Sequence, residues 1–208
     1  MPQAVRRTQA ERRDQSERSL LKATIEVIAS AGVGAVTFET LGRASGFSRG
    51  LATQRFGSKQ KLIEAVLAQL HERQEEMLRE HRLDERPGLE AVLTYLEVCL
   101  RNLEVHDESV AYIRLLSSAV ADANELRGAF REVHDQVEAR LMGWIAKGKA
   151  EGAIRADIDD RAAALMIGCT MFGVSMQRQV DPGADLAPTR EMALRMVRTT
   201  LADRPAEP

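Results

Sequence analysis

Apolar residues recur at spacings of three and four along nearly the whole chain, and this periodicity limits the possible folds more than any other feature. Such spacing places apolar side chains on one face of an α-helix, whereas a strand with one buried face needs strict alternation. No convincing run of alternation occurs, and aromatic residues, which strands favour, make up only 4% of the chain. The sequence therefore predicts an all-α fold.

Capping residues and helix breakers divide the periodic sequence into about nine helices. Thr37, Ser48 and Ser58 each precede an apolar pattern and are suited to cap a helix, because a hydroxyl can accept hydrogen bonds from the free N–H groups of the first turn. Helices are expected near residues 20–31, 37–44, 48–55, 58–78, 89–105, 109–121, 124–150, 159–180 and 188–201. The polar tails, residues 1–13 and 202–208, are expected to remain without order.

The 208 residues are enough for two small domains, and 44% of them are hydrophobic. We place a boundary at residue 60, with domains at 1–60 and 61–208. No apolar stretch approaches the roughly 20 residues of a membrane-spanning helix, so a cytoplasmic protein without a membrane partner is expected. Cys99 and Cys169 lie in apolar helical patterns, which favours reduced core thiols over a disulfide or a metal site.

Charge is distributed unevenly along the chain. Residues 1–60 contain ten Lys and Arg against five Asp and Glu, a net charge of +5 in a chain whose formal net charge is −2. A basic segment beside an acidic body is typical of a phosphate-binding module on a carrier domain, although it also occurs in proteins that never contact nucleic acid.

Three short helices within about forty residues, the last two joined by a tight turn at residues 45–47, predict a helix-turn-helix unit. The second helix is expected to pack through Leu41 and Ala44, and the turn through Phe47. Leu51 and Phe56 would hold the third helix against the first. The opposite face of the third helix then presents Arg49, Thr53, Gln54 and Arg55.

These exposed side chains are suited to read base edges. Gln can pair with adenine and Arg with guanine, and a Thr methyl group can meet that of thymine. Gly50 is costly in so short a helix, which indicates close approach of a partner, and Lys59 at a helix start suits a phosphate. The predicted DNA-binding residues are Thr37, Ser48, Arg49, Gly50, Thr53, Gln54, Arg55 and Lys59. Arg6, Arg7, Arg12 and Arg13 form either a DNA-binding arm or simply solvated charges.

The N-terminal segment resembles the tetracycline-repressor (TetR) family of bacterial regulators over about residues 16–66. The resemblance lies in Val36-Thr37-Phe38, Leu41-Gly42, residues 45–50 (Ser-Gly-Phe-Ser-Arg-Gly) and Phe56-Gly57-Ser58-Lys59 with Leu62, and a weaker echo occurs at residues 152–157. Where the family commonly has Leu-Tyr-Tyr-His-Phe, this chain has Ala-Thr-Gln-Arg-Phe at 52–56, so the family's base preference does not transfer. The resemblance implies a dimeric, ligand-responsive repressor that binds a palindromic DNA operator and is released by a small-molecule effector.

The resemblance also implies how the C-terminal region is used. In the family the last two helices form a four-helix dimer interface, and here they are rich in small and flexible apolar residues; the alternative is that these faces pack within one chain. The candidate residues for the homodimer are Leu165, Met166, Cys169, Phe172, Met176, Met192 and Met196. The candidate effector ligands are Tyr95, Cys99, Tyr112, Arg114, Trp144 and Phe172. A buried Arg114 would need a carboxylate, either from the protein or from an acidic effector.

Two other classes of protein compete with a regulator. An enzyme is disfavoured because the four histidines lack metal-ligand spacing and the chain has neither a phosphate-binding glycine loop nor a recognisable Ser/His/Asp set. No catalytic residue, metal or cofactor is therefore predicted. A helical protein-interaction adaptor that does not bind DNA remains the main alternative to the regulator.

Overall fold

In a computed structural model that describes residues 8–122 and 126–203, the chain is all-helical, as predicted. The described part contains nine α-helices and two single turns of 3₁₀ helix, η1 (Val33–Ala35) and η2 (Leu83–Glu85). The α-helices are α1 (Gln9–Ala31), α2 (Phe38–Ser45), α3 (Arg49–Phe56), α4 (Lys59–Glu80), α5 (Gly88–Val105), α6 (Asp107–Ala121), α7 (Leu126–Ala150), α8 (Asp160–Val180) and α9 (Ala187–Leu201).

The first helix begins earlier than expected. The polar tail predicted to extend to Arg13 is helical from Gln9, because Thr8 and Glu11 form a capping box. The Glu11 N–H donates to Thr8 Oγ1 at 3.2 Å, and the Thr8 N–H donates to a carboxylate oxygen of Glu11 at 2.7 Å. A cap satisfies free N–H groups that would otherwise fray, so the helix extends over residues without an apolar face. Arg6 and Arg7 lie outside the described residues.

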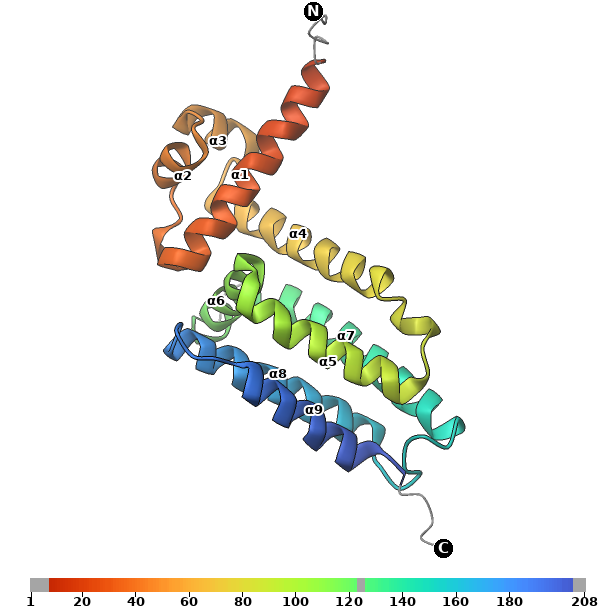
Figure 1. Cartoon of the computed structure of the whole chain (residues 1–208). Helices are drawn as coiled ribbons and strands as arrows, with labels where there is room; N and C mark the ends of the chain where they lie inside the picture. Colours follow the sequence, from red (N-terminus) through yellow and green to blue (C-terminus); the bar gives the residue numbers. More distant parts are fainter. Residues whose placement is uncertain (1–7, 123–125, 204–208) are drawn as a thin grey trace, which may run out of the picture.

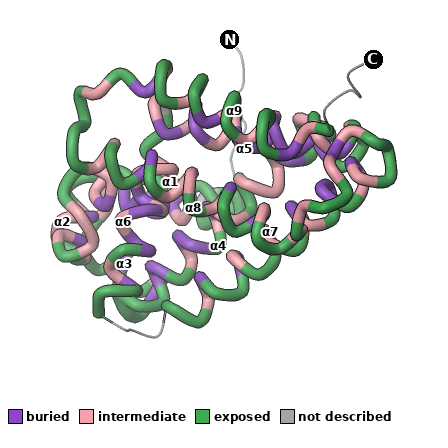
Figure 2. Tube along the Cα trace, turned by 90° about the horizontal axis from the view of Figure 1, so that it is seen from below, coloured by how far each residue is buried: buried purple, intermediate pink, exposed green. Residues whose placement is uncertain are grey.

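Figure 1 shows α1, α2 and α3 at one end of the molecule and α8 and α9 at the other, with α4 and α5 between them. Buried residues line the inward sides of the helices in Figure 2. No helix of the described residues is long and apolar enough to cross a membrane.

The first hydrophobic cluster joins the N-terminal helices to the rest of the chain. It contains Ile28 of α1, Leu41 of α2, Phe56 of α3 and the first half of α4 as far as Leu70. Residues of α6, among them Leu115, belong to the same cluster. The predicted boundary at residue 60 falls in the first turn of α4, so a continuous core crosses it.

The second hydrophobic cluster lies among α5, α7, α8 and α9. There α5 and α7 touch backbone to backbone, since a Cβ added to Gly88 would overlap the backbone of Gly148 and the carbonyl oxygen of Trp144. Glycine is therefore required at this crossing.

Candidate nucleic-acid interface and ligand cavity

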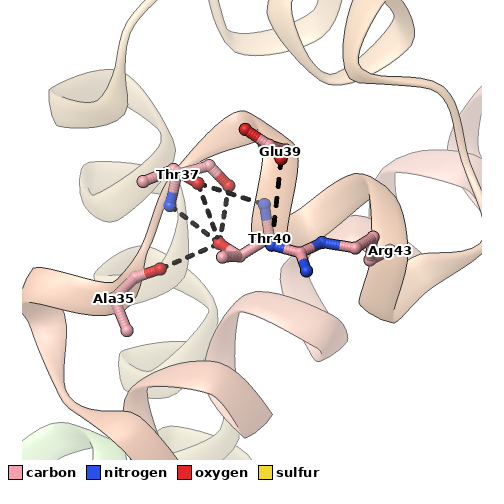
Figure 3. A network of polar contacts seen from close by, with 5 residues as sticks. All are labelled: Ala35, Thr37, Glu39, Thr40 and Arg43. Carbon is pink, nitrogen blue, oxygen red and sulfur yellow. Dashed lines mark hydrogen bonds and ion pairs between the residues drawn. The ribbon is translucent and has the colours of Figure 1, made fainter.

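Helix α2 starts with a reciprocal cap. The backbone N–H of Thr40 donates to Thr37 Oγ1 and that of Thr37 donates to Thr40 Oγ1, both at 3.0 Å. The Thr40 hydroxyl also donates to the carbonyl of Ala35 at 2.8 Å, and Figure 3 shows the two threonine side chains facing each other. Thr37 is exposed, and its oxygen serves the helix start. Glu39 pairs with Arg43 one turn on, at 3.9 Å.

The turn between α2 and α3 brings the two helices close together. Gly46 has the left-handed conformation, with φ of 74°, that ends α2. A Cβ on Gly42 would lie 2.9 Å from the carbonyl oxygen of Phe47, so this glycine allows the turn to fold back against α2. Phe47 is half-buried against the first cluster. Ala44, which was expected to pack, is exposed.

Helix α3 has one buried and one exposed side. Ala52 and Phe56 face the core, and Ser48 caps the helix by accepting a hydrogen bond from the Leu51 N–H at 3.2 Å. Arg49, Gly50, Thr53 and Gln54 are all exposed. These four residues are hereafter the α3 reading face. The Thr53 hydroxyl donates to the Arg49 carbonyl at 3.0 Å.

Gly42 of α2 and Gly50 of α3 differ in their surroundings. Apart from the adjacent residues and the backbone of α3 itself, only the hydroxyl of Ser48 among the described residues lies within 4 Å of a Cβ added to Gly50, at 3.8 Å. Gly50 therefore leaves open space on the α3 reading face, whereas Gly42, which sequence reasoning did not select, is the glycine in close contact. Both glycines lie in the motif, but only tertiary packing separates their roles.

Arg55 lies elsewhere than expected. It is half-buried, and its Nη2 donates to the carbonyl of Arg13 and to the hydroxyl of Ser16, both at 3.2 Å. These contacts attach α3 to the early part of α1. Arg55 is therefore turned away from the α3 reading face, because α1 is longer than the sequence pattern predicted.

Lys59 is exposed at the start of α4, where Ser58 accepts a hydrogen bond from the Lys61 N–H. Its ammonium donates to the carbonyl of Val33 at 2.8 Å. An ammonium has three donors, so two remain for a phosphate oxygen. Arg13, expected in the basic arm, is exposed on the first turns of α1.

A cavity of about 620 Å³ lies among α4, α5, α6, α7 and α8. This volume is within the range of small-molecule sites. Four predicted effector ligands line it: Tyr95 and Cys99 from α5, Tyr112 from α6 and Phe172 from α8. The amide of Gln74 on α4 donates to the Tyr95 hydroxyl at 3.0 Å and so crosses from α4 to α5.

Two predicted effector ligands do not line the cavity. Trp144 lies in the second cluster, and its indole N–H donates to a carboxylate oxygen of Asp84 at 2.9 Å. Arg114 donates through Nε to Gln179 Oε1 at 2.9 Å and through Nη1 to the carbonyl of Ile28 at 3.2 Å. The carboxylate partner expected for Arg114 is therefore replaced by the amide of Gln179 on α8 and the backbone carbonyl of Ile28 near the end of α1.

Several lining residues of α4 and α7 are not among the predicted effector ligands, because both helices read as ordinary amphipathic helices in the sequence. His134 of α7 stacks near Phe172, with ring centroids 5.3 Å apart, and Glu76, Glu80 and Glu138 also line the cavity. No local signal separates such residues from a solvated helix face.

Burial keeps four titratable groups that line the cavity uncharged. It raises the pKa of the Cys99 thiol to about 12 and the pKa values of the Tyr95 and Tyr112 hydroxyls above their ordinary value, because each anion would lose its hydration. Burial also lowers the pKa of His134. These four groups are therefore neutral near pH 7.

The outer sides of α8 and α9 carry exposed apolar residues. Met166 is 64% exposed and Met196 is 61% exposed, and the other exposed large apolar residues of these two helices are Leu165, which also lines the cavity, Met176, Val180 and Met192. Cys169 is also exposed, which differs from the core position expected for it. Phe172, predicted for both the dimer and the effector, is half-buried and lies against His134.

Comparison with known proteins agrees with this architecture. Residues 20–66 match the family model for bacterial regulatory proteins of the TetR family. No curated protein matches the chain significantly in sequence.

Solved structures of low sequence identity share the fold over most of the chain. A TetR transcriptional regulator from Chloroflexus aurantiacus is 19% identical, with a TM-score of 0.79, over 90% of this chain and 94% of its own. A transcriptional regulator from Saccharomonospora viridis in complex with choline is 17% identical, with a TM-score of 0.76, over 92% and 100%. NalD, the secondary repressor of the MexAB-OprM multidrug efflux pump in Pseudomonas aeruginosa, is 17% identical, with a TM-score of 0.66, over 92% and 98%.

Proposed function

We propose that the chain, whose residues 20–66 match the family model of the TetR regulators, is a dimeric DNA-binding repressor of that family that binds a palindromic operator and is released by a small-molecule effector. The family is one of regulators and not of enzymes. The α3 reading face is the observation that carries the proposal, since it leaves Arg49 and Gln54 exposed on the second helix of a helix-turn-helix.

In this proposal the side chains of the α3 reading face select bases in the major groove. Gln54 can form two hydrogen bonds with adenine, and Arg49 can do so with guanine. Because the Thr53 hydroxyl donates to the backbone of α3, Thr53 offers its methyl group to a thymine. Lys59 and the free N–H groups at the start of α4 hold a phosphate and set the register.

The dimer in this proposal forms through the exposed methionines of α8 and α9. A two-fold axis repeats each contact, so a continuous apolar face can cover itself. Large exposed apolar patches are rare on monomers, which supports an interface here. The two α3 helices of the dimer would then meet half-sites about 34 Å apart, one turn of DNA.

The effector in this proposal binds in the cavity among α4–α8, and the complex of the Saccharomonospora viridis protein with choline supports a small-molecule role for such a domain. Release needs an effector with higher affinity for a dimer whose reading faces do not fit the operator. Repression follows the precedent of NalD, whose structure shares this fold.

The proposal is tested by selecting bound duplexes from a random pool with the purified full chain, and then measuring affinity for the selected duplex against salt. A two-fold symmetric consensus with steeply salt-dependent affinity is the expected result, because phosphate contacts release counterions. Failure to enrich any sequence, with or without a metabolite mixture, would support the adaptor that does not bind DNA.

A further inference from the structure

The charged residues of the cavity limit the kind of effector it can take. Among the described residues, the Asp, Glu, Lys and Arg side chains that line the cavity are four carboxylates and one guanidinium: Glu76, Glu80, Glu108, Glu138 and Arg73. Sequence reasoning allowed an acidic effector because Arg114 was placed in the cavity. With Arg114 bound to Gln179 and Ile28, that argument no longer holds.

The one guanidinium in this set, that of Arg73, already has a carboxylate partner. Arg73 pairs with Glu76 at 2.7 Å, and Glu138 pairs with Arg161 at 2.8 Å. Within the part of the chain that the structure describes, Glu80 and Glu108 have no ion pair. An anionic ligand would thus meet excess negative charge with no free Lys or Arg in the lining to bind it, and a buried charge without a partner is costly.

The interior suits an apolar body with aromatic contacts. Phe172 from α8 and Tyr112 from α6 bring two rings to the wall, and Met77 and Met171 line it with adaptable thioethers. A cation is attracted to the face of an aromatic ring, most strongly where water is excluded. Glu108 lies four residues before Tyr112, so both project from the same side of α6.

We propose that the cavity binds a lipophilic monocation, an organic ammonium with an apolar body of drug-like size, with the carboxylates of Glu108 and Glu80 offsetting its charge and the rings of Phe172 and Tyr112 enclosing it. This inference rests on the effector role proposed for the cavity, and adds the chemical class of the ligand. Glu108 is half-buried and Glu80 is exposed, so Glu108 contributes more to the selection of charge.

The test is calorimetric titration of the full chain without DNA, using three probes with the same phenylalkyl body: 4-phenylbutyltrimethylammonium, 4-phenylbutanol and 5-phenylpentanoate. The ammonium should bind about tenfold more tightly than the alcohol, and the carboxylate should bind most weakly. Equal affinity for the three probes, tightest binding of the carboxylate, or no binding of the ammonium would overturn the proposal.

Variants connect that selectivity to the residues. Glu108→Gln should weaken ammonium binding about fivefold while leaving the affinity for the alcohol unchanged. Phe172→Leu should weaken binding of the ammonium more than binding of the alcohol, since the substitution keeps apolar volume and removes the aromatic ring. Glu191→Gln, an exposed acid on α9 that does not line the cavity, is the matched control and should change neither affinity. An unchanged ratio of ammonium to alcohol affinity in Glu108→Gln would contradict the assigned role.

The same probe then separates this inference from the proposed function. Adding 4-phenylbutyltrimethylammonium to the complex with the selected duplex should release the DNA. Binding of the probe in calorimetry without release would contradict the effector role and still support the ligand class. Release of DNA only by the carboxylate would support an effector site and overturn the ligand class.

Discussion

The guanidinium of Arg114 on α6 donates a hydrogen bond of 3.2 Å to the backbone carbonyl of Ile28 in the last turns of α1. The same side chain binds Gln179 near the end of α8. Its neighbour in the chain, Ile113, lines the cavity, and Ile28 is fully buried in the core of the N-terminal helices. Arg114 therefore joins the cavity wall, the outer helix layer and the helix-turn-helix unit.

We expect Arg114→Gln to weaken the transmission of cavity occupancy to the DNA. The shorter amide cannot span both partners, so α6 would move more independently of α1. The variant should bind the selected duplex and the effector with near-normal affinity, yet the effector should shift DNA affinity several-fold less than in the parent. DNA titrations with and without saturating effector measure this coupling. Arg131→Gln, on the exposed side of α7, is the control, and equal coupling in the parent and Arg114→Gln would refute the prediction.

Substitutions on the α3 reading face should separate base selection from phosphate binding. Gln54→Ala and Arg49→Ala should each cost roughly 1–3 kcal/mol on the selected duplex and relax the preference at one position per half-site. Lys59→Ala should weaken specific and random DNA alike and reduce the salt dependence. Competition assays with both duplexes provide the measurement. Equal losses on specific and random DNA for Gln54→Ala would rule out base reading by this residue.

Arg55→Ala should lower stability rather than change base preference. The guanidinium ties α3 to α1 through Arg13 and Ser16, and its loss should reduce the free energy of unfolding by roughly 1 kcal/mol. Urea unfolding measures this, and sequence selection with the variant should return the parent consensus. A changed consensus would mean that Arg55 contacts bases after all.

The apolar face of α8 and α9 predicts how to separate the dimer. Met166→Glu combined with Met196→Glu would place like charges across a two-fold interface, so the chain should become monomeric at micromolar concentration and lose affinity for the palindrome. Sedimentation velocity gives the assembly state. Ala139→Glu adds a charge to an exposed position of α7 and should leave the dimer intact. A double variant that stays dimeric would exclude this face as the interface.

Gly88→Ala should destabilise the C-terminal helices. The new methyl group would overlap the backbone of α7 at Gly148, and overpacking of this kind costs about 1–3 kcal/mol or more. Gly128→Ala is a matched control, since a Cβ there meets nothing within 4 Å and should stabilise α7 by roughly 0.5–1 kcal/mol. Thermal unfolding of both variants tests the contrast, and equal stability of Gly88→Ala and the parent would contradict the backbone contact.

Local chemistry determined much of this protein. The spacing of apolar residues predicted the helices, and Thr37, Ser48 and Ser58 cap three of them as expected, because a cap involves only the residues of one turn. Most predicted boundaries agree with the structure to within two residues. The order of motifs at residues 36–62 likewise predicted the TetR family model that residues 20–66 match, since a helix-turn-helix is built from neighbouring segments.

Only the tertiary structure decided which side chains remain free to contact DNA or a ligand. Arg55 and Arg114 looked equally available in the sequence, yet each donates to α1, from 42 and 86 residues away along the chain. Likewise, Gly42 and Gly88 proved to lie at close contacts, whereas Gly50 did not. Periodicity gives the face of a helix on which a residue lies, but the partner of that face depends on contacts between distant segments. The cavity is likewise formed by five helices at once, so its charge, and with it the kind of ligand it favours, could be read only after the helices were packed.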